Sequence, residues 1–481
     1  MQQPKKISRL LKALARQGLD VTYQDKIYTV RLQNAPEAPP AEILLPENFP
    51  IEGKALKQLA NLASIRHPAG GKVTQICATP DFHPGDAGVA IGSVVKTENM
   101  VIPAAVGSDI NCGMRLHVAD LSVDRFLAQR DRFIELMKGD YFLGTRDVVM
   151  TAKTSRALFQ QGILGWLSSM SPNPMGSVVK SDFSQLWEEI ERVYLDGSLD
   201  GNLRYAPPDL IPETGLVRDG DLATIGGGNH FVEIQTVEYV ADKATAYQWG
   251  VREGQLAFMV HSGSRTVGKY IGGMWRDRAW RAWQTGTGYP PSRLFSLSAV
   301  ANSQLVEEYL QAQATAANYG FVNRMLLAEL LRLRLRQVFG SAIAAPLVYD
   351  LPHNITLPDK NDWITRKGAC PAELGQPVII PGSMGAPSFL LTGLGNKRFL
   401  SSASHGAGRN KSRFELSRKG AKYSEEELGL TGIDCITFRE ERRIEEAPLA
   451  YKPIQPVIAT QVAAEMVKVV ARLRPILTFK A

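Results

Sequence analysis

Four of the seven histidines lie in short strings that are rich in glycine or asparagine. These strings are Gly226-Gly-Gly-Asn-His230, His261-Ser-Gly-Ser-Arg265, His353-Asn354 and His405-Gly-Ala-Gly-Arg409. A fifth string, from Gly107 to Gly113, places Asp109 and Cys112 three residues apart. Because glycine lets the backbone turn tightly, loops of this composition can direct polar side chains inward. The pattern favours a functional site built from several loops.

The combination of imidazole, carboxylate and thiol predicts a transition-metal site. Soft sulfur disfavours magnesium and calcium, whereas histidine is a common ligand of manganese, iron, cobalt, nickel and zinc. Asp109 and Cys112 could bind one ion, or the Cys112 thiolate could bridge two ions. His230, His261 and His353 would complete the site from three other loops. A single histidine is more often a structural residue than a ligand, and this alternative stays open for each of them taken alone.

The string that begins at His405 predicts a phosphate-binding loop. The backbone N–H groups of residues 406–408 and the Arg409 guanidinium can surround a phosphate. Residues 381–388 form a second loop with backbone donors and hydroxyls. An unprotonated imidazole beside a metal-polarised phosphate is a competent nucleophile, so His405 is either that nucleophile or a further metal ligand. Together the strings indicate a metal-assisted phosphate site.

Residues 263–270 nearly match the phosphate-binding motif G-x-x-x-x-G-K-[ST]. The last position is Tyr270, which cannot supply the short hydroxyl that ligates magnesium. No regular βαβ order surrounds the string. We therefore do not expect a P-loop NTPase, although Arg265 and Lys269 stay candidates for phosphate contacts.

The composition is that of a globular protein, with 44% hydrophobic and 21% charged residues among 481, which excludes a disordered or fibrous chain. A net charge of +7 slightly favours a polyanionic partner such as RNA or DNA. The four cysteines form no C-x-x-C pair, so neither a disulfide framework nor a zinc ribbon is expected. Without a signal-peptide or membrane-span pattern, we expect a cytoplasmic protein.

Strands and helices alternate without a regular βαβ rhythm, which predicts an α+β fold. We expect a small αββ appendage over residues 1–35, a proline-rich linker without regular structure over 36–50, and a large mixed α/β domain over 51–481. The appendage would contain a helix within 1–18 and strands at 21–23 and 27–32. The segment 140–221, in which prolines frame a polar helix, is either an insertion or a lid.

Apolar spacing predicts the main elements of the large domain. Helices are expected at 183–195, at 302–338 with a break near 315–319, and at 456–472, and strands within 94–102, 256–260 and 378–380.

From Gly53 to Ala481 the chain resembles the RtcB family of RNA-splicing ligases. The resemblance is carried by Pro80-Asp81-Phe-His83-Pro-Gly85, the string from Ile102 to Met114, Gly228-Asn229-His230-Phe-Val-Glu233, His261 to Arg265, His353-Asn354, Arg366-Lys-Gly368, Pro381 to Gly385, His405 to Arg409, Ala450-Tyr451-Lys452 and Arg474 to Lys480. These strings follow one another in the order typical of the family.

The resemblance implies an enzyme that depends on GTP and two Mn²⁺ ions. It would join an RNA 2′,3′-cyclic phosphate or 3′-phosphate end to a 5′-hydroxyl end, in RNA splicing or repair. By analogy Cys112 bridges the two ions, with Asp109 and His230 on one and His261 and His353 on the other. His405 would take GMP from GTP and pass it to the RNA 3′-phosphate, which the 5′-hydroxyl then attacks.

The same resemblance implies the residues that hold the guanylate and the partners of the protein. The guanylate-binding residues would be Asn229, Glu233, Ser383, Ser388, Gly406, Ala407, Gly408, Tyr451 and Lys480. Arg265, Arg409 and His83 are candidate RNA or phosphate contacts, with His83 equally interpretable as a structural turn residue. The resemblance also implies a monomer that could need an archease-type activator.

The chain departs from the usual pattern at Thr266, where glycine is common, and at Lys411, where an apolar residue is common. The segments 1–35 and 140–221 also match poorly, which leaves the selection of RNA ends open. Three alternatives remain: a paralogue that caps 3′-phosphate ends with GMP without sealing them, a metal-dependent phosphodiesterase, and a catalytically silent RNA-binding protein.

Overall fold

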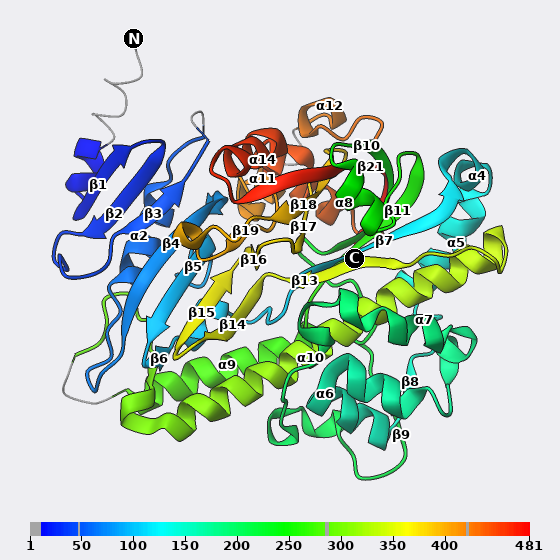
Figure 1. The fold of residues 1–481 in the computed structure, drawn as a ribbon, viewed down its shortest axis with the longest axis horizontal. Coiled ribbons are helices and arrows are strands. Elements are labelled where there is room, and N and C mark those ends of the chain that lie inside the picture. The colour runs from blue at the N-terminus through cyan, green and yellow to red at the C-terminus, as the bar shows by residue number, and fades with distance from the viewer. Residues whose placement is uncertain (1–10, 47–48, 284–287, 420–422) are drawn as a thin grey trace.

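A computed structural model describes residues 11–46, 49–283, 288–419 and 423–481. Two large, mainly antiparallel sheets and a set of helices make up the described chain, which confirms the α+β prediction (Figure 1). No helix within the described ranges is long and apolar enough to span a membrane.

The first sheet has seven strands in the order β1-β2-β3-β4-β5-β15-β14. Their bounds are Leu19–Gln24, Ile27–Leu32, Ala41–Leu44, Lys72–His83, Ile91–Glu98, Asp362–Lys367 and Asn354–Asp359. Helix α2 (Gly53–Ala63) covers this sheet and shares an apolar core with it. The predicted hairpin is present, and residues 11–15 of the predicted first helix are helical, whereas residues 1–10 lie outside the described ranges.

The second sheet follows the order β13-β7-β11-β10-β21-β18-β17. These strands are Leu347–Pro352, Gly113–Ser122, Gln255–Ser262, Phe231–Val240, Val467–Phe479, Ser388–Gly393 and Pro377–Ile380, and β20 (Cys435–Ile436) pairs with β21. Three short two-stranded ladders join β6 (Met100–Val101) to β12 (Leu297–Ser298), β16 (Ala369–Pro371) to β19 (Ser402–Ser404), and β8 (Val149–Thr151) to β9 (Leu216–Arg218).

Helix α10 (Ala299–Phe339) is the longest element and contacts both sheets, α9 (Arg265–Ala282), α6 (Ala152–Met170) and α5 (Arg130–Phe142) (Figure 1). The other helices are α3 (Pro103–Val106), α4 (Val123–Ala128), α7 (Phe183–Glu188), α8 (Lys243–Gln248), α11 (Arg413–Lys419), α12 (Glu425–Leu428), α13 (Glu440–Glu445) and α14 (Ile454–Ala463).

Helix α10 continues through residues 315–319, so the predicted break is wrong. The polar side chains of this stretch bond to neighbouring loops and do not interrupt the helix. Asn318 Nδ2 donates to the carbonyls of Phe159 and Leu199 at 3.0 and 2.8 Å, and Thr315 Oγ1 donates to the Asn202 carbonyl at 3.1 Å. A helix buried on all sides needs such partners for its polar groups.

The prediction of one helix over 456–472 is also wrong. Helix α14 ends at Ala463, Glu465 adopts a positive φ of 52°, and Val467–Phe479 forms strand β21. β21 lies between β10 and β18, and its apolar side chains pack on both faces of the sheet. A strand buried on both faces lacks clear alternation, so its valines also fit a helical spacing.

Three further boundaries differ from the sequence predictions. The proline-rich segment 36–50 contains strand β3, which pairs with β2 and β4. The prediction that this segment lacks regular structure is therefore wrong for Ala41–Leu44. The helix predicted at 183–195 ends at Glu188 and gives way to 3₁₀ turns, where Leu195 and Asp196 have positive φ. The strand predicted within 94–102 is divided at Asn99 (φ 56°) into β5 and β6.

A network of buried ion pairs connects α10 to the second sheet. Arg324 on α10 donates to Asp350 Oδ1 on β13 through Nε at 2.9 Å and Nη2 at 2.7 Å. Arg115 on β7 donates to Asp350 Oδ2 at 3.2 Å. The remaining Arg324 nitrogen, Nη1, donates to the Asn111 carbonyl at 2.5 Å and the Ser262 carbonyl at 3.2 Å. One buried guanidinium therefore joins helix α10, strands β11 and β13, and the loop that contains Asn111.

We expect Asp350→Asn to destabilise the protein by about 3–5 kcal/mol, because it leaves two buried arginines without their shared counter-charge. Urea unfolding followed by circular dichroism measures this loss. The exposed Arg398–Glu42 pair is the matched control, and Arg398→Ala should cost about 1 kcal/mol or less. A similar small loss for both variants would contradict the structural role given to Asp350.

Candidate functional site

Strand pairing places four of the predicted metal ligands at one edge of the second sheet. Cys112 directly precedes β7, His230 precedes β10, His261 lies near the end of β11, and His353 follows β13. The registers pair His261 with Phe231 and Met114, and Pro352 with Gly113. Because β13, β7, β11 and β10 are neighbours in the sheet, ligands distant in the chain become adjacent.

Glycine at 113 permits this approach. A Cβ atom there would lie 2.6 Å from the Leu351 carbonyl oxygen, inside the strand that leads to His353. The His353 backbone N–H then donates to the Cys112 carbonyl at 2.8 Å. Any larger residue would push the His353 loop away from the thiol.

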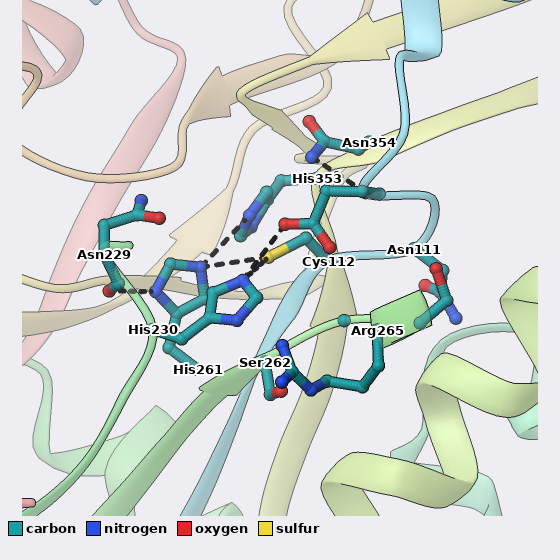
Figure 2. A network of polar contacts seen from close by, with 12 residues as sticks. Asn111, Cys112, Asn229, His230, His261, Ser262, Arg265, His353 and Asn354 are labelled. Atoms are coloured by element: carbon teal, nitrogen blue, oxygen red, sulfur yellow. Dashed lines mark hydrogen bonds and ion pairs between the residues drawn. The ribbon is translucent and has the colours of Figure 1, made fainter. Parts of the chain in front are cut away.

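The ligand atoms form two groups that share Cys112 (Figure 2). Cys112 Sγ lies 3.2 Å from the Nε2 atoms of both His230 and His261. His261 Nε2 lies 3.3 Å from His353 Nε2, and His230 Nε2 lies 3.0 Å from Asp109 Oδ2. One group is Cys112, His261 and His353, and the other is Asp109, Cys112 and His230.

The hydrogen bonds of the imidazoles suit this donor set to a metal. His230 Nδ1 donates to the Ile225 carbonyl and His261 Nδ1 to the Asn229 carbonyl, each at 3.1 Å. A neutral ring that donates from Nδ1 carries its lone pair on Nε2. The lone pairs of His230 and His261 thus face a thiol and, for His230, a carboxylate, an arrangement that a cation between them would satisfy.

Burial tunes the ionisation of the same residues. Burial lowers the pKa of His261 and of His353 well below the usual histidine range, which favours neutral, ligating imidazoles. Burial and the adjacent Asp109 carboxylate raise the pKa of the Cys112 thiol. Although burial alone raises the pKa of Asp109, the electrostatic interaction and the hydrogen bond with His230 outweigh it and hold that pKa below its usual value.

His405 lies beside this cluster, with its ring centroid 4.8 Å from that of His353. Its Nδ1 contacts Asp81 Oδ2 at 2.7 Å, and its backbone N–H donates to the same oxygen at 3.2 Å. Thr79 Oγ1 donates to the other Asp81 oxygen at 2.6 Å. Burial alone raises the pKa of Asp81, but the hydrogen bonds from His405 and Thr79 outweigh burial and lower it.

Asp81 is a site residue that the sequence prediction missed. Its signal was present, because it lies in the Pro80–Gly85 string, but its partner is 324 positions away in the chain. Gly408 allows the contact, since a Cβ atom there would lie 2.2 Å from the Asp81 carbonyl oxygen. His83 is nearby, and its Nδ1 donates to that carbonyl at 2.8 Å. Burial lowers the pKa of His83 to about 3, so this ring is neutral at pH 7.

A buried carboxyl group lies at another part of the site. Glu233 accepts hydrogen bonds from Thr478 Oγ1 at 2.7 Å and Gln235 Nε2 at 2.6 Å. Burial raises the pKa of Glu233 to about 7, although these bonds and the charge of Lys480 oppose the shift. Lys480 Nζ donates to the His230 carbonyl at 3.1 Å, so the terminal strand contacts the metal-ligand loop.

An ionic cluster fixes the loop that follows His405. Arg409 Nη1 lies 3.0 Å from Glu446 Oε2, Arg413 Nε lies 2.7 Å from Glu446 Oε1, and the Tyr451 hydroxyl donates to Glu446. Burial alone raises the pKa of Glu446, but the charges of Lys480, Arg409 and Arg413 outweigh it and lower the pKa. The carboxylate therefore stays ionised at the wall of the site.

These residues surround a cavity of about 700 Å³. Most of the predicted site residues line it: His83, Asp109, Cys112, Asn229, Glu233, His261, His353, Ser383, His405, Gly406, Ala407, Gly408, Arg409, Tyr451 and Lys480. No lining residue comes from segment 140–221, which packs against α10 through Phe159 and Trp166, so it forms part of the core and not a lid.

Four predicted residues do not line the cavity: His230, Ser388, Arg265 and Lys269, the last on α9. His230 lies behind Cys112 and Asp109. Ser388 is buried and accepts hydrogen bonds from Gln235 Nε2 at 2.9 Å and the Gly382 N–H at 3.3 Å. Arg265 Nε donates to Thr224 Oγ1 at 3.0 Å, and its side chain lies next to that of Ser262, whose Oγ donates to the Thr224 carbonyl at 3.2 Å (Figure 2).

Two further residues join the site without having been predicted for it. Asn354 Nδ2 donates to the Asp109 carbonyl at 3.0 Å, while its Oδ1 accepts from the Gly368 N–H at 2.8 Å. Lys367 lines the cavity and donates to the Val106 carbonyl at 2.8 Å. Both belong to strings quoted for the family resemblance, His353-Asn354 and Arg366-Lys-Gly368.

Comparison with known proteins gives one consistent result. The family described as tRNA-splicing ligase RtcB matches residues 58–481. A tRNA-splicing ligase RtcB of Aeropyrum pernix is 31% identical over 474 residues, covering 90% of this chain and 94% of the relative. That of Nanoarchaeum equitans is 32% identical over 442 residues, covering 85% and 88%. An RNA-splicing ligase RtcB of Mycobacterium tuberculosis is 31% identical over 450 residues, covering 87% and 99%.

We expect Glu233→Gln to stabilise the ligand-free protein at pH 8. The carboxyl group has a pKa of about 7 in the folded protein and about 4.5 unfolded, so it binds more protons when folded and stability falls as pH rises between these values. Above pH 7 the buried charge costs about 3 kcal/mol, and glutamine removes that cost. Urea unfolding between pH 4.5 and 8.5 measures the difference.

The advantage of Glu233→Gln should shrink toward pH 4.5, where the wild-type carboxyl is protonated in the folded protein and half protonated in the unfolded chain. Glu238→Gln, on the same strand but near the surface, is the control and should show no such pH-dependent gain. A pH-independent difference for Glu233→Gln would refute the elevated pKa.

Proposed function

The chain belongs to the RtcB family of tRNA-splicing ligases, a family of RNA ligase enzymes, and from this premise we propose that it seals RNA ends with GTP and Mn²⁺. The proposed substrates are RNA strands with a 3′-phosphate or 2′,3′-cyclic phosphate and strands with a 5′-hydroxyl. The observation that carries the proposal is the His405 ring, held by Asp81 and facing a cavity beside two overlapping groups of metal ligands.

The hydrogen bond to Asp81 supports a nucleophilic role for His405. Because the buried carboxylate accepts the Nδ1 proton, the lone pair of the neutral ring is on Nε2. In the proposed first step, Nε2 attacks the α-phosphorus of GTP, a P–N bond forms, and the bond to pyrophosphate breaks. Asp81 stabilises the positive charge that develops on the ring, as a carboxylate does for a catalytic histidine.

The next two steps return His405 to its starting state. An oxygen of the RNA 3′-phosphate attacks the same phosphorus, so the P–N bond breaks and GMP passes to the RNA end. A cyclic end must first be opened by water to give a 3′-phosphate. The 5′-hydroxyl then attacks the 3′-phosphate, a phosphodiester bond forms, and GMP leaves.

The donor set fits two Mn²⁺ ions, with Cys112 shared, Asp109 and His230 in one group, and His261 and His353 in the other. When bound, such ions would neutralise phosphate oxygens and polarise phosphorus. The protein fixes these ligands through the Ile225 and Asn229 carbonyls and through the Cys112 carbonyl, which accepts from the His353 N–H.

The cavity also supports a guanylate-binding role for the residues around Glu233. As a carboxylate, Glu233 can accept hydrogen bonds from the N1–H and amino group of guanine, which adenine cannot provide at that edge. Lys480, Asn229, Ser383, Tyr451 and the loop from Gly406 to Gly408 lie around the same cavity, and Ser388 supports it from behind through Gln235. We further propose a cytoplasmic monomer, with an archease-type activator as a candidate partner.

We expect His405→Ala to lose all covalent labelling when the protein is incubated with Mn²⁺ and GTP labelled at the α-phosphate. The imidazole supplies the nitrogen of the P–N bond, so the protein cannot be labelled without it. Denaturing electrophoresis measures retained, acid-labile label. Asp81→Asn should keep the fold but label roughly tenfold more slowly or worse, because the ring loses the carboxylate that orients it.

Labelled wild-type protein is then given RNA with a 3′-phosphate and RNA with a 5′-hydroxyl. Sealed product supports the ligase, whereas RNA capped with GMP and left unsealed indicates the capping paralogue. Absence of label in folded, metal-loaded wild-type protein would overturn the proposal and favour the phosphodiesterase or the silent RNA-binding protein.

We expect metal analysis by mass spectrometry to find two Mn²⁺ per chain after loading and dialysis. His353→Ala and His230→Ala should each retain one ion, since each removes a ligand from one group only. Cys112→Ala should lose most of both, because its Sγ belongs to both groups. Cys370→Ala, a buried cysteine outside both groups, is the control, and equal metal in all variants would contradict the shared site.

A further inference from the structure

The wall of the cavity continues beyond the phosphate-binding loop as residues 410–414, which lead into α11. The backbone of this segment is held in place. The N–H groups of Asn410 and Lys411 donate to the Ala450 carbonyl at 2.7 and 3.2 Å, and Arg409 Nε donates to the Lys411 carbonyl at 3.1 Å. Side chains carried here therefore keep a defined place relative to His405.

Phe414 is the unusual residue of this segment. It lines the same cavity as His405, yet its side chain is 71% exposed. Glu233, Thr478 and Lys480, by contrast, are buried. Phe414 therefore lies at the mouth of the cavity and not in the enclosed part that suits a guanine base.

Lys411 lies three residues before Phe414 and also lines the cavity. Its Nζ lies 5.3 Å from the centroid of the Tyr423 ring, a cation–π contact with a residue that does not line the cavity. It is one of the positions where this chain departs from the usual apolar residue of its family. An aromatic ring and a lysine three residues apart thus line the same cavity.

A mononucleotide fits inside a cavity of about 700 Å³, but an RNA strand does not. The terminal phosphate of the RNA strand must reach His405, while the rest of the strand extends out through the mouth of the cavity. Single-stranded nucleic acid is commonly held by stacking of bases on aromatic rings and by cations along the backbone. An exposed phenylalanine beside a lysine matches that chemistry.

We propose that Phe414 and Lys411 hold the last nucleotides of the RNA 3′-phosphate strand, with the Phe414 ring stacked on a base and the Lys411 ammonium against a backbone phosphate. This inference rests on the proposed ligase function and adds the residues that grip the RNA end. Neither base stacking nor a single phosphate contact depends on base identity. The clamp formed by Phe414 and Lys411 would therefore accept any terminal sequence.

The test separates the two half-reactions. Phe414→Ala should raise KM for the 3′-phosphate RNA by between about 5-fold and 100-fold, the loss expected for one base stack, while labelling of His405 by GTP stays within about twofold. Phe414→Trp should restore RNA binding and show fluorescence quenching when a 3′-phosphate oligonucleotide is added. Lys411→Ala should weaken RNA binding and lower the slope of log affinity against log salt concentration by about one phosphate contact. Lys411→Arg should keep the wild-type affinity and slope.

Tyr247→Ala is the matched control, because Tyr247 on α8 is 85% exposed and does not line the cavity. Unchanged KM for RNA in Phe414→Ala overturns the clamp. A parallel loss of GTP labelling also overturns it, since Phe414 would then serve the nucleotide. If the ligase proposal itself is wrong, the result is different, because the wild-type protein then takes up no covalent label from GTP.

Discussion

The site depends on the buried ion pair between Arg324 and Asp350. Arg324 uses two nitrogens for the carboxylate and the third for the carbonyls of Asn111 and Ser262, each next to a metal ligand in the chain. Asn323, its neighbour on α10, donates to Ser262 Oγ at 3.0 Å and the Gly263 carbonyl at 3.1 Å. Helix α10 thereby fixes the Cys112 loop and the end of β11, which carries His261, relative to β13, which leads to His353. A buried charge pair costs desolvation, and here it positions three ligands.

Backbone carbonyls then decide what the ligands can do. The acceptors at Ile225 and Asn229 set the tautomers of His230 and His261, and Asp81 does the same for His405. In each case a neutral ring that donates from Nδ1 carries its lone pair on Nε2. The imidazole therefore suits metal binding at His230 and His261 and the proposed nucleophilic attack at His405, because its Nε2 faces different groups at these residues.

Sheet order explains why separated strings form one site. Cys112, His230, His261 and His353 come from four neighbouring strand ends, whereas His405 arrives from the ladder formed by β16 and β19. Asp81 comes from β4, in the other sheet. The proposed nucleophile thus lies where the two sheets meet, with its orienting carboxylate on one sheet and the metal ligands on the other.

Local sequence patterns alone predicted many of the candidate site residues, the fold class and the first hairpin. Glycine-flanked histidines, the pair Asp109 and Cys112 and the loop after His405 require no long-range contact to be recognised, because their chemistry and backbone freedom are local properties. The α+β class and the hairpin at residues 19–32 followed from alternation in the same way. Only the tertiary structure decided the end of α14, the course of α10 through residues 315–319, strand β3 and the partnership of Asp81 with His405. Burial on both sides hides periodicity in β21, loop carbonyls satisfy polar groups within α10, and a contact across 324 residues leaves no spacing to detect.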